Sequence, residues 1–507
     1  MMKYTIADSI WMSSQSYPDR IAIEVLHDDG SAEQWTYSTM WDRVRSLAAG
    51  LTGIGSGPAG PMAAILLQNS ADALLAYLAC QVAGVGAVPV NTRLAPPEMQ
   101  YVVEDSGARV ILAASPYLDI AFDVAATCAH EVRVIDASTV VTESHPHAAF
   151  VADGASIGGV FYTSGTTGFP KGAMVANGDW LVNALRWGWQ LGIRDDEVML
   201  VPGPIFHLSF GSFALCTLMI GGRLRIMPTF DAARACDEFV DTCTMSFLVP
   251  SMTAMISEHW RNSGGAPMPA LRTMMTSAAA ITPGQLEEAY RMFPNVRIIE
   301  VYGWTEAGFA SFETKHIETV QDATVGWAHV GCEVALFDDD GHRIRSGRGE
   351  IGVRTIAHFA GYLNKPGATD AAFQGEYLMS GDIGELMPDG RLKIVDRKKQ
   401  MIISGGENIY SAEVERTVLE HPSVKEVAVV GKADERWGEI VVACVVPADP
   451  TAFDLDVLRA HCRRGLAGYK NPREFLILDE LPRNSMGKVQ KFVLADRVAG
   501  RTSTGVQ

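Results

Sequence analysis

The sequence predicts an α/β protein with a large N-terminal domain of parallel sheets and helices, a small β-rich part, and a smaller α+β C-terminal domain. Three observations support this class. A chain of 507 residues is too long for one hydrophobic core. Short apolar segments alternate with helical patterns over most of the length, as in parallel sheets covered by helices. Over residues 331–390 the pattern changes to short strands separated by Asp-Gly turns.

The alternation begins with an apolar strand over residues 62–67, a helix from about Ser70 and a second strand over 86–90. The apolar run 73–90 is barely long enough to cross a membrane. Because two glycines and a proline interrupt it, we expect a buried helix ending near Gly84 and a buried strand, and no transmembrane segment. Further strands are expected at 110–113, 132–135, 158–162, 197–201, 224–227 and 296–300.

The β-rich part is expected over about residues 331–396, with turns at Asp340-Gly341 and Asp389-Gly390. A polar run then joins it to a region with its own pattern, a helix over 411–420 and strands over 426–430 and 440–446. The predicted domains are therefore residues 1–396 and 397–507, with a hinge at 397–400.

Composition excludes some functions. Acidic residues outnumber basic residues by 59 to 42, and the net charge of −17 argues against nucleic acid as a partner. The eight cysteines are scattered with no Cys-x-x-Cys pair, so neither a zinc ribbon nor a redox pair is indicated. Without a signal peptide, reduced thiols in a cytoplasmic protein are expected.

A loop of small residues follows the strand at 158–162. It consists of hydroxyl residues and glycines, and Lys171 stands at its exit. Glycines let successive backbone N–H groups turn toward one anion, hydroxyls add donors, and lysine adds positive charge. It is not the Walker loop, because Pro170 precedes the lysine and Gly172 follows it. The loop predicts a phosphate site, with a flexible surface loop as the alternative; its candidate ligands are Thr163, Ser164, Gly165, Thr166, Thr167, Gly168 and Lys171.

The run from Ser164 to Gly172 resembles the signature loop of the adenylate-forming superfamily, which includes acyl-CoA synthetases, stand-alone adenylation enzymes and luciferases. Further segments occur in the order that the superfamily shows, so the resemblance covers almost the whole chain. These segments are 277–280, 302–306, 380–384, 404–410 and 482–491. The resemblance implies acyl-adenylate formation from ATP, rotation of a mobile C-terminal domain, and attack of a thiol on the adenylate.

In the segment 302–306, the resemblance implies that Tyr302 stacks on adenine, Thr305 contacts the α-phosphate and Glu306 holds Mg²⁺. A hard cation prefers such oxygen ligands. Taken alone, Glu306 would be a solvated carboxylate in a turn. Ala278 and Gly303 would complete this part of the nucleotide site, although the turn 277–280 carries alanine where relatives have glycine and proline.

The C-terminal segments imply further contacts. Asp382, placed between glycines in an expected turn, would accept hydrogen bonds from both ribose hydroxyls. Arg397 would bind ribose or phosphate, and Lys399 would lie at the hinge. Lys488 would contact the carboxylate and the α-phosphate, where a cation stabilises developing negative charge. The pantetheine arm of CoA would pass along Ser404, Gly405 and Gly406.

His207 lies in an aromatic segment, where a satisfied core histidine is the alternative to a site residue. The resemblance places it at the carboxylate end of an acyl pocket. The remaining residues implied for this pocket are Phe210, Gly211, Ser277, Gly303 and Trp304. The predicted catalytic residues are Lys488, Thr167, Glu306 and His207.

The residues at three places in the sequence exclude some classes of carboxylic acid as the substrate. The segment 206–213 lacks the aspartate that would hold an amino acid's ammonium group, and Val301 stands where malonate-type relatives carry arginine. Gly303 stands where acetate-type relatives carry tryptophan. We therefore expect a medium- or long-chain fatty acid or an aryl acid, with ATP, Mg²⁺ and CoA. Three other functions are left open: transfer of the acyl group to a carrier protein, luciferase chemistry, and non-catalytic nucleotide binding. A homodimer is also left open.

Overall fold

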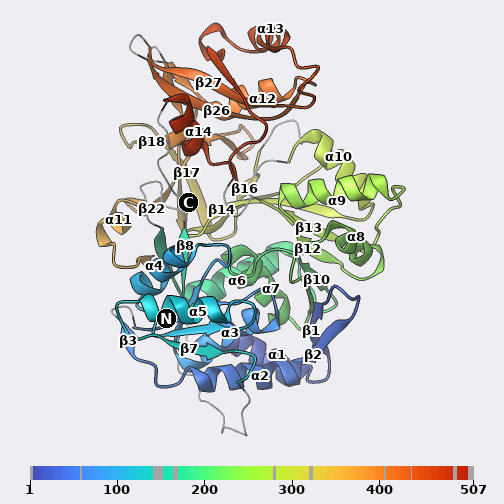
Figure 1. Cartoon of the computed structure of the whole chain (residues 1–507), viewed down its shortest axis with the longest axis vertical. Coiled ribbons are helices and arrows are strands. Elements are labelled where there is room, and N and C mark those ends of the chain that lie inside the picture. Colours follow the sequence, from blue (N-terminus) through green and yellow to red (C-terminus); the bar gives the residue numbers. More distant parts are fainter. Residues whose placement is uncertain are drawn as a thin grey trace. The chain divides into compact units, whose positions relative to one another are not determined.

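The computed structural model describes residues 4–57, 60–140, 152–163, 170–277, 281–318, 324–404, 407–434, 437–483 and 488–500. The chain forms two compact units, one of residues 1–334 and 353–378 and one of residues 335–352 and 379–507. Figure 1 shows their elements, with parallel sheets and helices in the larger unit, and the predicted fold class is confirmed. The boundary at residues 396–397 falls inside the second unit and stays a prediction.

The first sheet of the larger unit consists of β1 (Ile21–Leu26), β2 (Ala32–Thr36), β10 (Val198–Val201), β11 (Arg223–Ile226), β12 (Met245–Phe247), β13 (Thr273–Thr276), β14 (Arg297–Trp304), β15 (Gly308–Thr314) and β16 (Trp327–Ala328). Their order is β16-β15-β14-β13-β12-β10-β11-β1-β2. The strands from β14 to β1 pair in parallel, whereas β15, β16 and β2 pair antiparallel. The strands expected from apolar runs in this region are confirmed.

The second sheet consists of β3 (Ser56–Gly57), β4 (Gly60–Leu66), β5 (Gly86–Pro89), β6 (Val110–Ala113), β7 (Arg133–Asp136), β8 (Ile157–Thr163), β9 (Lys171–Ala176) and β20 (Gly361–Tyr362). The order is β20-β9-β8-β5-β4-β6-β7, with β3 paired to β4. Strand β20 comes from a distant part of the sequence and pairs antiparallel with β9. It therefore brings residues near 362 beside the strand that leaves the phosphate loop.

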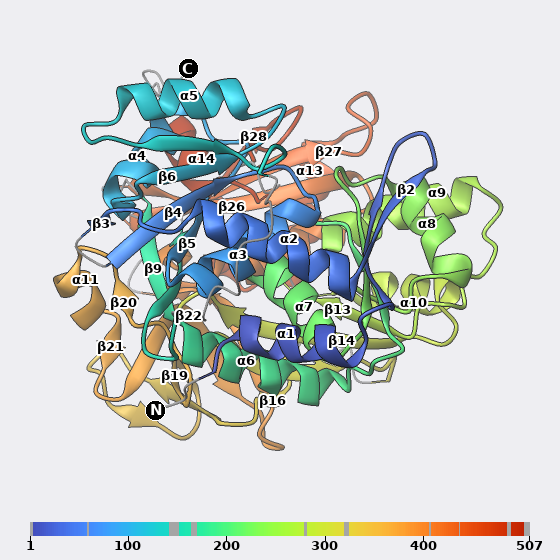
Figure 2. The ribbon, with the colours of Figure 1, turned by 90° about the horizontal axis from the view of Figure 1, so that it is seen from below.

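Helices cover these sheets, and Figure 2 shows α4 and α5 beside β6. The helices of the larger unit are α1 (Ile6–Ser16), α2 (Tyr37–Gly50), α3 (Ala71–Ala83), α4 (Pro96–Ser106), α5 (Leu118–Thr127), α6 (Asn177–Leu191), α7 (Leu208–Met219), α8 (Ala232–Asp241), α9 (Pro250–Asn262), α10 (Pro283–Met292) and α11 (Pro366–Asp370). Helix α3 ends at Gly84 in a left-handed conformation, as predicted. None of the helices in the described part of the chain has both the length and the apolar character of a membrane span.

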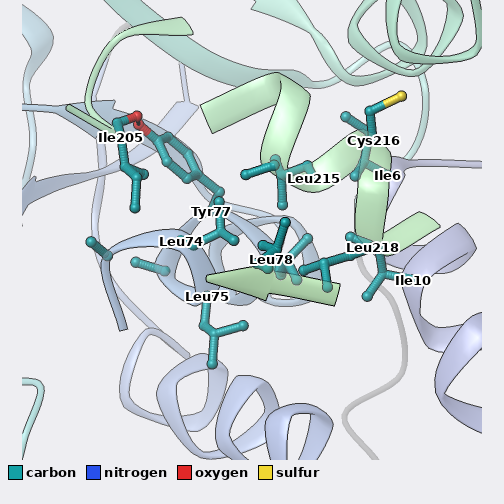
Figure 3. Close-up of a cluster of buried hydrophobic side chains, with 14 of the residues drawn as sticks. Ile6, Ile10, Leu74, Leu75, Tyr77, Leu78, Ile205, Leu215, Cys216 and Leu218 are labelled. Atoms are coloured by element: carbon teal, nitrogen blue, oxygen red, sulfur yellow. Dashed lines mark hydrogen bonds between the residues drawn. The ribbon is translucent and has the colours of Figure 1, made fainter. Parts of the chain in front are cut away.

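Helix α3 is buried in the main core. Figure 3 shows its Leu74, Leu75, Tyr77 and Leu78 among side chains of α1 and α7. The hydroxyl of Tyr77 donates a hydrogen bond to the carbonyl oxygen of Ile205 at 3.0 Å. The buried α3 therefore fixes the loop between β10 and α7, which carries His207. All eight cysteines are free thiols, consistent with the expected reduced state.

A third sheet has the order β18-β17-β19-β22-β21, with β23 paired to β22. Its strands are β17 (Cys332–Phe337), β18 (Arg343–Ile344), β19 (Arg348–Thr355), β21 (Phe373–Gln374), β22 (Tyr377–Leu386) and β23 (Leu392–Arg397). Short strands were expected from about residue 331, and β17 and β19 are the first two long strands of this part.

The C-terminal part of the second unit has its own sheet and core. Its strands are β24 (Ile402–Ser404), β25 (Glu407–Ile409), β26 (Val424–Asp434), β27 (Gly438–Pro447) and β28 (Glu474–Ile477). Its helices are α12 (Ser411–Leu419), α13 (Leu455–Gly465) and α14 (Lys491–Val498), and the short 3-10 helices are η2 (Lys398–Gln400) and η3 (Gly468–Lys470). The helix and the two long strands predicted in this region are confirmed.

Candidate active site

The segment 302–306 lies on the β14–β15 hairpin. We expected it to follow a strand ending at Glu300, but β14 continues to Trp304 because it pairs with β15. The pairing shifts register between Tyr302 and Gly303. A Cβ atom at Gly303 would lie 2.0 Å from the carbonyl oxygen of Gly308, so the close approach of the two strands requires glycine there. The hairpin thus fixes the backbone on both sides of Thr305 and Glu306.

Glu306 is a buried carboxylate, with 8% of its surface exposed. Its Oε1 atom accepts a hydrogen bond from the hydroxyl of Tyr362 at 2.6 Å. Its backbone carbonyl accepts a hydrogen bond from the N–H of Phe359 at 2.8 Å. Within the described residues, no side chain donates to Oε2. That oxygen can therefore bind a hard cation, and the residue fits the Mg²⁺ that the fold implies.

Tyr362 joins two parts of the predicted site and was missed by the sequence reasoning. Its ring centroid lies 5.1 Å from Nζ of Lys171, in a cation–π contact. Burial raises the pKa of Tyr362, and the neighbouring Glu306 raises it further, so the hydroxyl remains a donor at neutral pH. No local motif marks this tyrosine, because its role depends on the pairing of β20 with β9.

The phosphate loop connects the antiparallel pair β8 and β9. Thr163 and Lys171 face each other across the pair, and the Thr163 hydroxyl donates to the carbonyl oxygen of Lys171 at 3.4 Å. The two ends of the loop are therefore held together. The other loop residues predicted to bind phosphate, Ser164, Gly165, Thr166, Thr167 and Gly168, lie outside the described residues, as does Ala278.

His207 immediately precedes α7, and its loop is held by Asn69. The Asn69 amide nitrogen donates to the carbonyl oxygen of Gly203 at 2.7 Å, and its Oδ1 accepts from the N–H of Ile205 at 2.9 Å. Burial lowers the pKa of His207 to about 4, and the positive charge of Arg93 adds to this, so the imidazole is neutral at pH 7. Its Nε2 is buried with no hydrogen-bond partner among the described residues. A buried nitrogen of this kind is a candidate for a ligand contact.

A narrow pocket adjoins this region. Two predicted residues, Thr305 and Glu306, lie in its wall beside Leu208, the neighbour of His207. The remaining wall is formed by Val175, Trp180, Asn183, Trp187, Gly308, His358 and Phe359. The pocket therefore extends from the candidate metal residue to one face of α6.

Several residues predicted for the acyl pocket do not line this cavity. Phe210 packs against Phe247 with ring centroids 4.8 Å apart, and Trp304 lies 5.8 Å from the ring of Tyr302. A Cβ atom at Gly211 would lie 2.9 Å from the carbonyl oxygen of Ile205, so close packing accounts for that glycine. Ser277 directly follows β13. Their assignment to an acyl pocket stays a prediction.

Three predicted nucleotide ligands gather in the second unit. Asp382 was expected in a turn but lies on β22, opposite Arg397 on β23, because these strands pair through residues 382–397. Arg397 Nε lies 3.0 Å from Asp382 Oδ1. Partial desolvation lowers the pKa of Lys488, and repulsion from Arg397 adds to this, whereas Asp382 opposes it. Asp382, Arg397 and Lys488 therefore share one electrostatic environment.

The segment predicted to guide CoA forms the β24–β25 hairpin, in which Ser404 pairs with Glu407. Ser404 is buried, and Gly405 and Gly406 lie outside the described residues. Lys399, predicted at the hinge, lies in the short helix η2. Both roles remain predictions.

Comparison with known proteins agrees with this arrangement. Residues 10–363 match the family model described as AMP-binding enzyme, and residues 413–488 match the AMP-binding enzyme C-terminal domain. The chain is 30% identical to the long-chain-fatty-acid–CoA ligase FadD13 of Mycobacterium tuberculosis, over 96% of this chain and 98% of that protein. It is 34% identical to a feruloyl-CoA synthase of an Amycolatopsis species, over 90% of this chain and 92% of that protein.

A solved structure shows the same fold. The o-succinylbenzoate CoA synthetase MenE of Bacillus subtilis, in complex with its acyl-adenylate intermediate, superposes with a TM-score of 0.86 at 28% identity. The match covers 100% of this chain and 99% of that one. Because these matches extend over nearly its whole length, the chain belongs to the AMP-binding enzyme family of the adenylate-forming superfamily.

Proposed function

We propose that the protein is an AMP-forming acid–thiol ligase, which activates a hydrophobic carboxylic acid with ATP and transfers the acyl group to CoA. One observation carries the proposal. Glu306 is buried in the pocket wall, with one oxygen held by Tyr362 and the other available to a cation. A carboxylate in that state, beside Thr305 and linked through Tyr362 to Lys171, suits a metal–phosphate complex.

The first step joins an oxygen of the acid to the α-phosphorus of ATP, and the bond to pyrophosphate breaks. The protein's task is to align the reactants and neutralise charge on the phosphoryl oxygens. Lys171 and Lys488 supply positive charge, and Thr163, Thr167 and Thr305 supply hydroxyl donors. Mg²⁺ bound at Glu306 would neutralise phosphate charge.

His207 is suited to the acid end of this reaction. Because its pKa is lowered to about 4, the neutral ring offers one N–H donor and one acceptor and adds no charge to the pocket. Its buried Nε2 atom has no partner in the described part of the chain, so a substrate oxygen could supply one. This supports a role in positioning the carboxylate, in preference to a satisfied core histidine.

The acceptor of the acyl group is the second question. The two sequence relatives described above are a CoA ligase and a CoA synthase by name, which supports CoA. Transfer to a carrier protein would use the same first step and the same residues. The thiol then attacks the acyl carbonyl carbon, AMP leaves, and a thioester forms.

The experiment measures pyrophosphate release with MgATP and a panel of fatty and aryl acids, each with and without CoA. Turnover that requires CoA for one class of acid is the expected result. Pyrophosphate release that CoA does not stimulate would support the carrier-protein alternative. No release with any acid would overturn the proposed ligase activity.

A further inference from the structure

Helix α4 contacts both ends of the phosphate loop through tyrosine side chains. Tyr162 lies near the end of β8, where the loop begins, and Pro170 directly precedes β9, where it ends. The Tyr162 hydroxyl donates to Oδ2 of Asp105 on α4 at 2.8 Å. The hydroxyl of Tyr101, on the same helix, donates to the carbonyl oxygen of Pro170 at 3.0 Å. A helix that comes well before the loop in sequence therefore holds it on both sides.

The groups of α4 that make these contacts are themselves arranged as a pair. Tyr101 and Asp105 are one helical turn apart and therefore project from the same face of the helix. The rings of Tyr101 and Tyr162 meet edge to face, with centroids 6.3 Å apart. Burial raises the pKa of Tyr162, and the charge of Asp105 raises it further, so its hydroxyl remains a donor at neutral pH.

A lysine from a distant part of the sequence strengthens the contact at the loop exit. Lys365 follows β20, and its Nζ donates to the Tyr101 hydroxyl at 3.0 Å. This hydrogen bond raises the pKa of Lys365, so the lysine stays charged. The Tyr101 hydroxyl thus accepts from an ammonium while it donates to a carbonyl, and a hydroxyl polarised in this way is a stronger donor.

The turn that carries Lys365 is fixed against both α4 and β9. The N–H of Leu363 donates to the carbonyl oxygen of Gly172 at 2.8 Å. The amide nitrogen of Asn364 donates to the carbonyl oxygen of Asp105 at 2.9 Å. Asn364 has a φ of 54°, in the left-handed region that asparagine adopts more readily than most residues. The ammonium of Lys365 therefore reaches Tyr101 from a defined turn.

A fixed Pro170 carbonyl constrains the residue that follows it. The peptide group is planar, so the carbonyl of Pro170 lies in one plane with the N–H and the Cα atom of Lys171. Lys171 carries the positive charge at the loop exit, and its ammonium lies over the ring of Tyr362. Charges and donors aimed at phosphate act best when they are held in place before the reaction.

We propose that Tyr101 and Lys365 are positioning residues for the phosphate loop. Lys365 holds the Tyr101 hydroxyl, which in turn holds the loop exit at Pro170, and the contact of Tyr162 with α4 holds the loop entry. Without these contacts the loop would have to be ordered when ATP binds, which costs binding free energy. The inference rests on the proposed function, because it takes the loop to bind the phosphates of ATP.

The main test is Tyr101→Phe, which removes the hydroxyl and keeps the ring that packs on Tyr162. The KM for MgATP should rise by about five- to tenfold, whereas the KM for the acid should change by about twofold at most. Loss of a merely structural contact would lower the thermal midpoint without separating the two KM values. An unchanged KM for MgATP would overturn the assignment, whatever the thermal midpoint of the variant.

Tyr117→Phe is the matched control. Tyr117 packs against the same hydrophobic cluster as Tyr101 and Tyr162, but its hydroxyl has no hydrogen-bond partner among the described residues. This variant should keep the wild-type KM for MgATP. If both variants raise that KM equally, the effect comes from the cluster and not from the contact with the loop, and the assignment fails.

Two variants of Lys365 test whether it acts through Tyr101. Lys365→Met removes the ammonium and should raise the KM for MgATP by about threefold, whereas Lys365→Arg keeps a charged donor and should stay close to wild type. Adding Lys365→Met to Tyr101→Phe should change little, because the hydroxyl through which the lysine acts is already absent. Full additivity in the double variant, or an equal loss in Lys365→Arg, would overturn the role of Lys365.

Equilibrium binding of MgATP separates this inference from the ligase proposal. If no acid supports pyrophosphate release, but wild-type protein binds MgATP and Tyr101→Phe binds it about fivefold more weakly, the positioning role stands and the ligase function fails. If both proteins bind MgATP equally well, or neither binds it, the positioning role fails whatever the activity.

Discussion

The two clusters of predicted site residues are held in different ways. In the larger unit, Glu306 is buried, its partner Tyr362 is neutral, and the close approach of Gly303 to Gly308 fixes the surrounding hairpin. In the second unit, strands β22 and β23 place Arg397 opposite Asp382, and the Arg397 side chain is 51% exposed whereas that of Asp382 is 9% exposed. Packing fixes the geometry around Glu306, whereas the cation that faces Asp382 is half in solvent.

This difference indicates that the two clusters are suited to different tasks. A group that holds a metal and phosphates benefits from a preorganised position, because no reorganisation is then needed during the reaction. A lysine that acts in one step and is absent in the next benefits from weak, replaceable contacts. The domain rotation that the resemblance implies would require the second behaviour of Lys488, and a half-exposed neighbour such as Arg397 is compatible with it.

The largest effect is expected for Lys488→Ala. Removing a cation aimed at developing charge should reduce adenylate formation by about a thousandfold, while the remaining phosphate contacts retain ATP binding. The measurement is pyrophosphate release beside equilibrium binding of ATP. Adenylation at the wild-type rate would show that Lys488 is a surface residue, and a matched loss of ATP binding would show that it acts in the ground state.

The charge state of Lys488 gives a second readout of the same cluster. Because the pKa of Lys488 is lowered, it loses its proton at a lower pH than an ordinary lysine, and adenylation should decline on the alkaline side accordingly. In Lys488→Arg the guanidinium stays charged, so whatever activity remains should lose this alkaline decline. An alkaline decline at the same pH in both proteins would assign it to another group.

Glu306→Gln should have the next largest effect, about a hundredfold on adenylation. The glutamine keeps an acceptor for Tyr362 and the packing of the hairpin but loses the negative charge that would bind Mg²⁺. A titration with Mg²⁺ should show a higher concentration for half-maximal activity. An unchanged Mg²⁺ dependence would assign the metal to other ligands.

Tyr362→Phe should reduce adenylation by about three- to tenfold, because it removes one hydrogen bond but retains the ring over Lys171. If Tyr362 acts by positioning Glu306, the Mg²⁺ titration should shift in this variant and the double variant with Glu306→Gln should be less than additive. Full additivity would separate Tyr362 from the metal residue and weaken the view that packing preorganises this cluster.

Local patterns in the sequence predicted the elements better than the contacts between them. The strands at 62–67 and 110–113 and the helix ending at Gly84 follow from apolar runs and punctuation by glycine, and the structure has them at those places. Residues 302–304 were expected to follow a strand and Asp382 to lie in a turn, but strand pairing incorporates both, and Thr305 and Glu306 lie in the turn after β14. Tyr362 could not be found in this way, since its significance comes from residues distant in sequence.

The smallest expected effect concerns His207 in the larger unit, whose pKa is lowered by burial. In the unfolded chain a histidine binds its proton near pH 6.5, but folded His207 does so only near pH 4. The unfolded state therefore binds more protons in this window, so stability is fully present above pH 6.5 and falls as the pH drops toward 4, by about 3 kcal/mol in total. His329 behaves in the same way and contributes a parallel loss.

In His207→Asn the thermal midpoint should consequently fall less between pH 7 and pH 5 than in wild type, by a few degrees. If the thermal midpoint falls equally with pH in both proteins, His207 is not buried and neutral. Raised salt screens the Asp382–Arg397 pair, but it should leave the pH dependence of the thermal midpoint nearly unchanged in either protein.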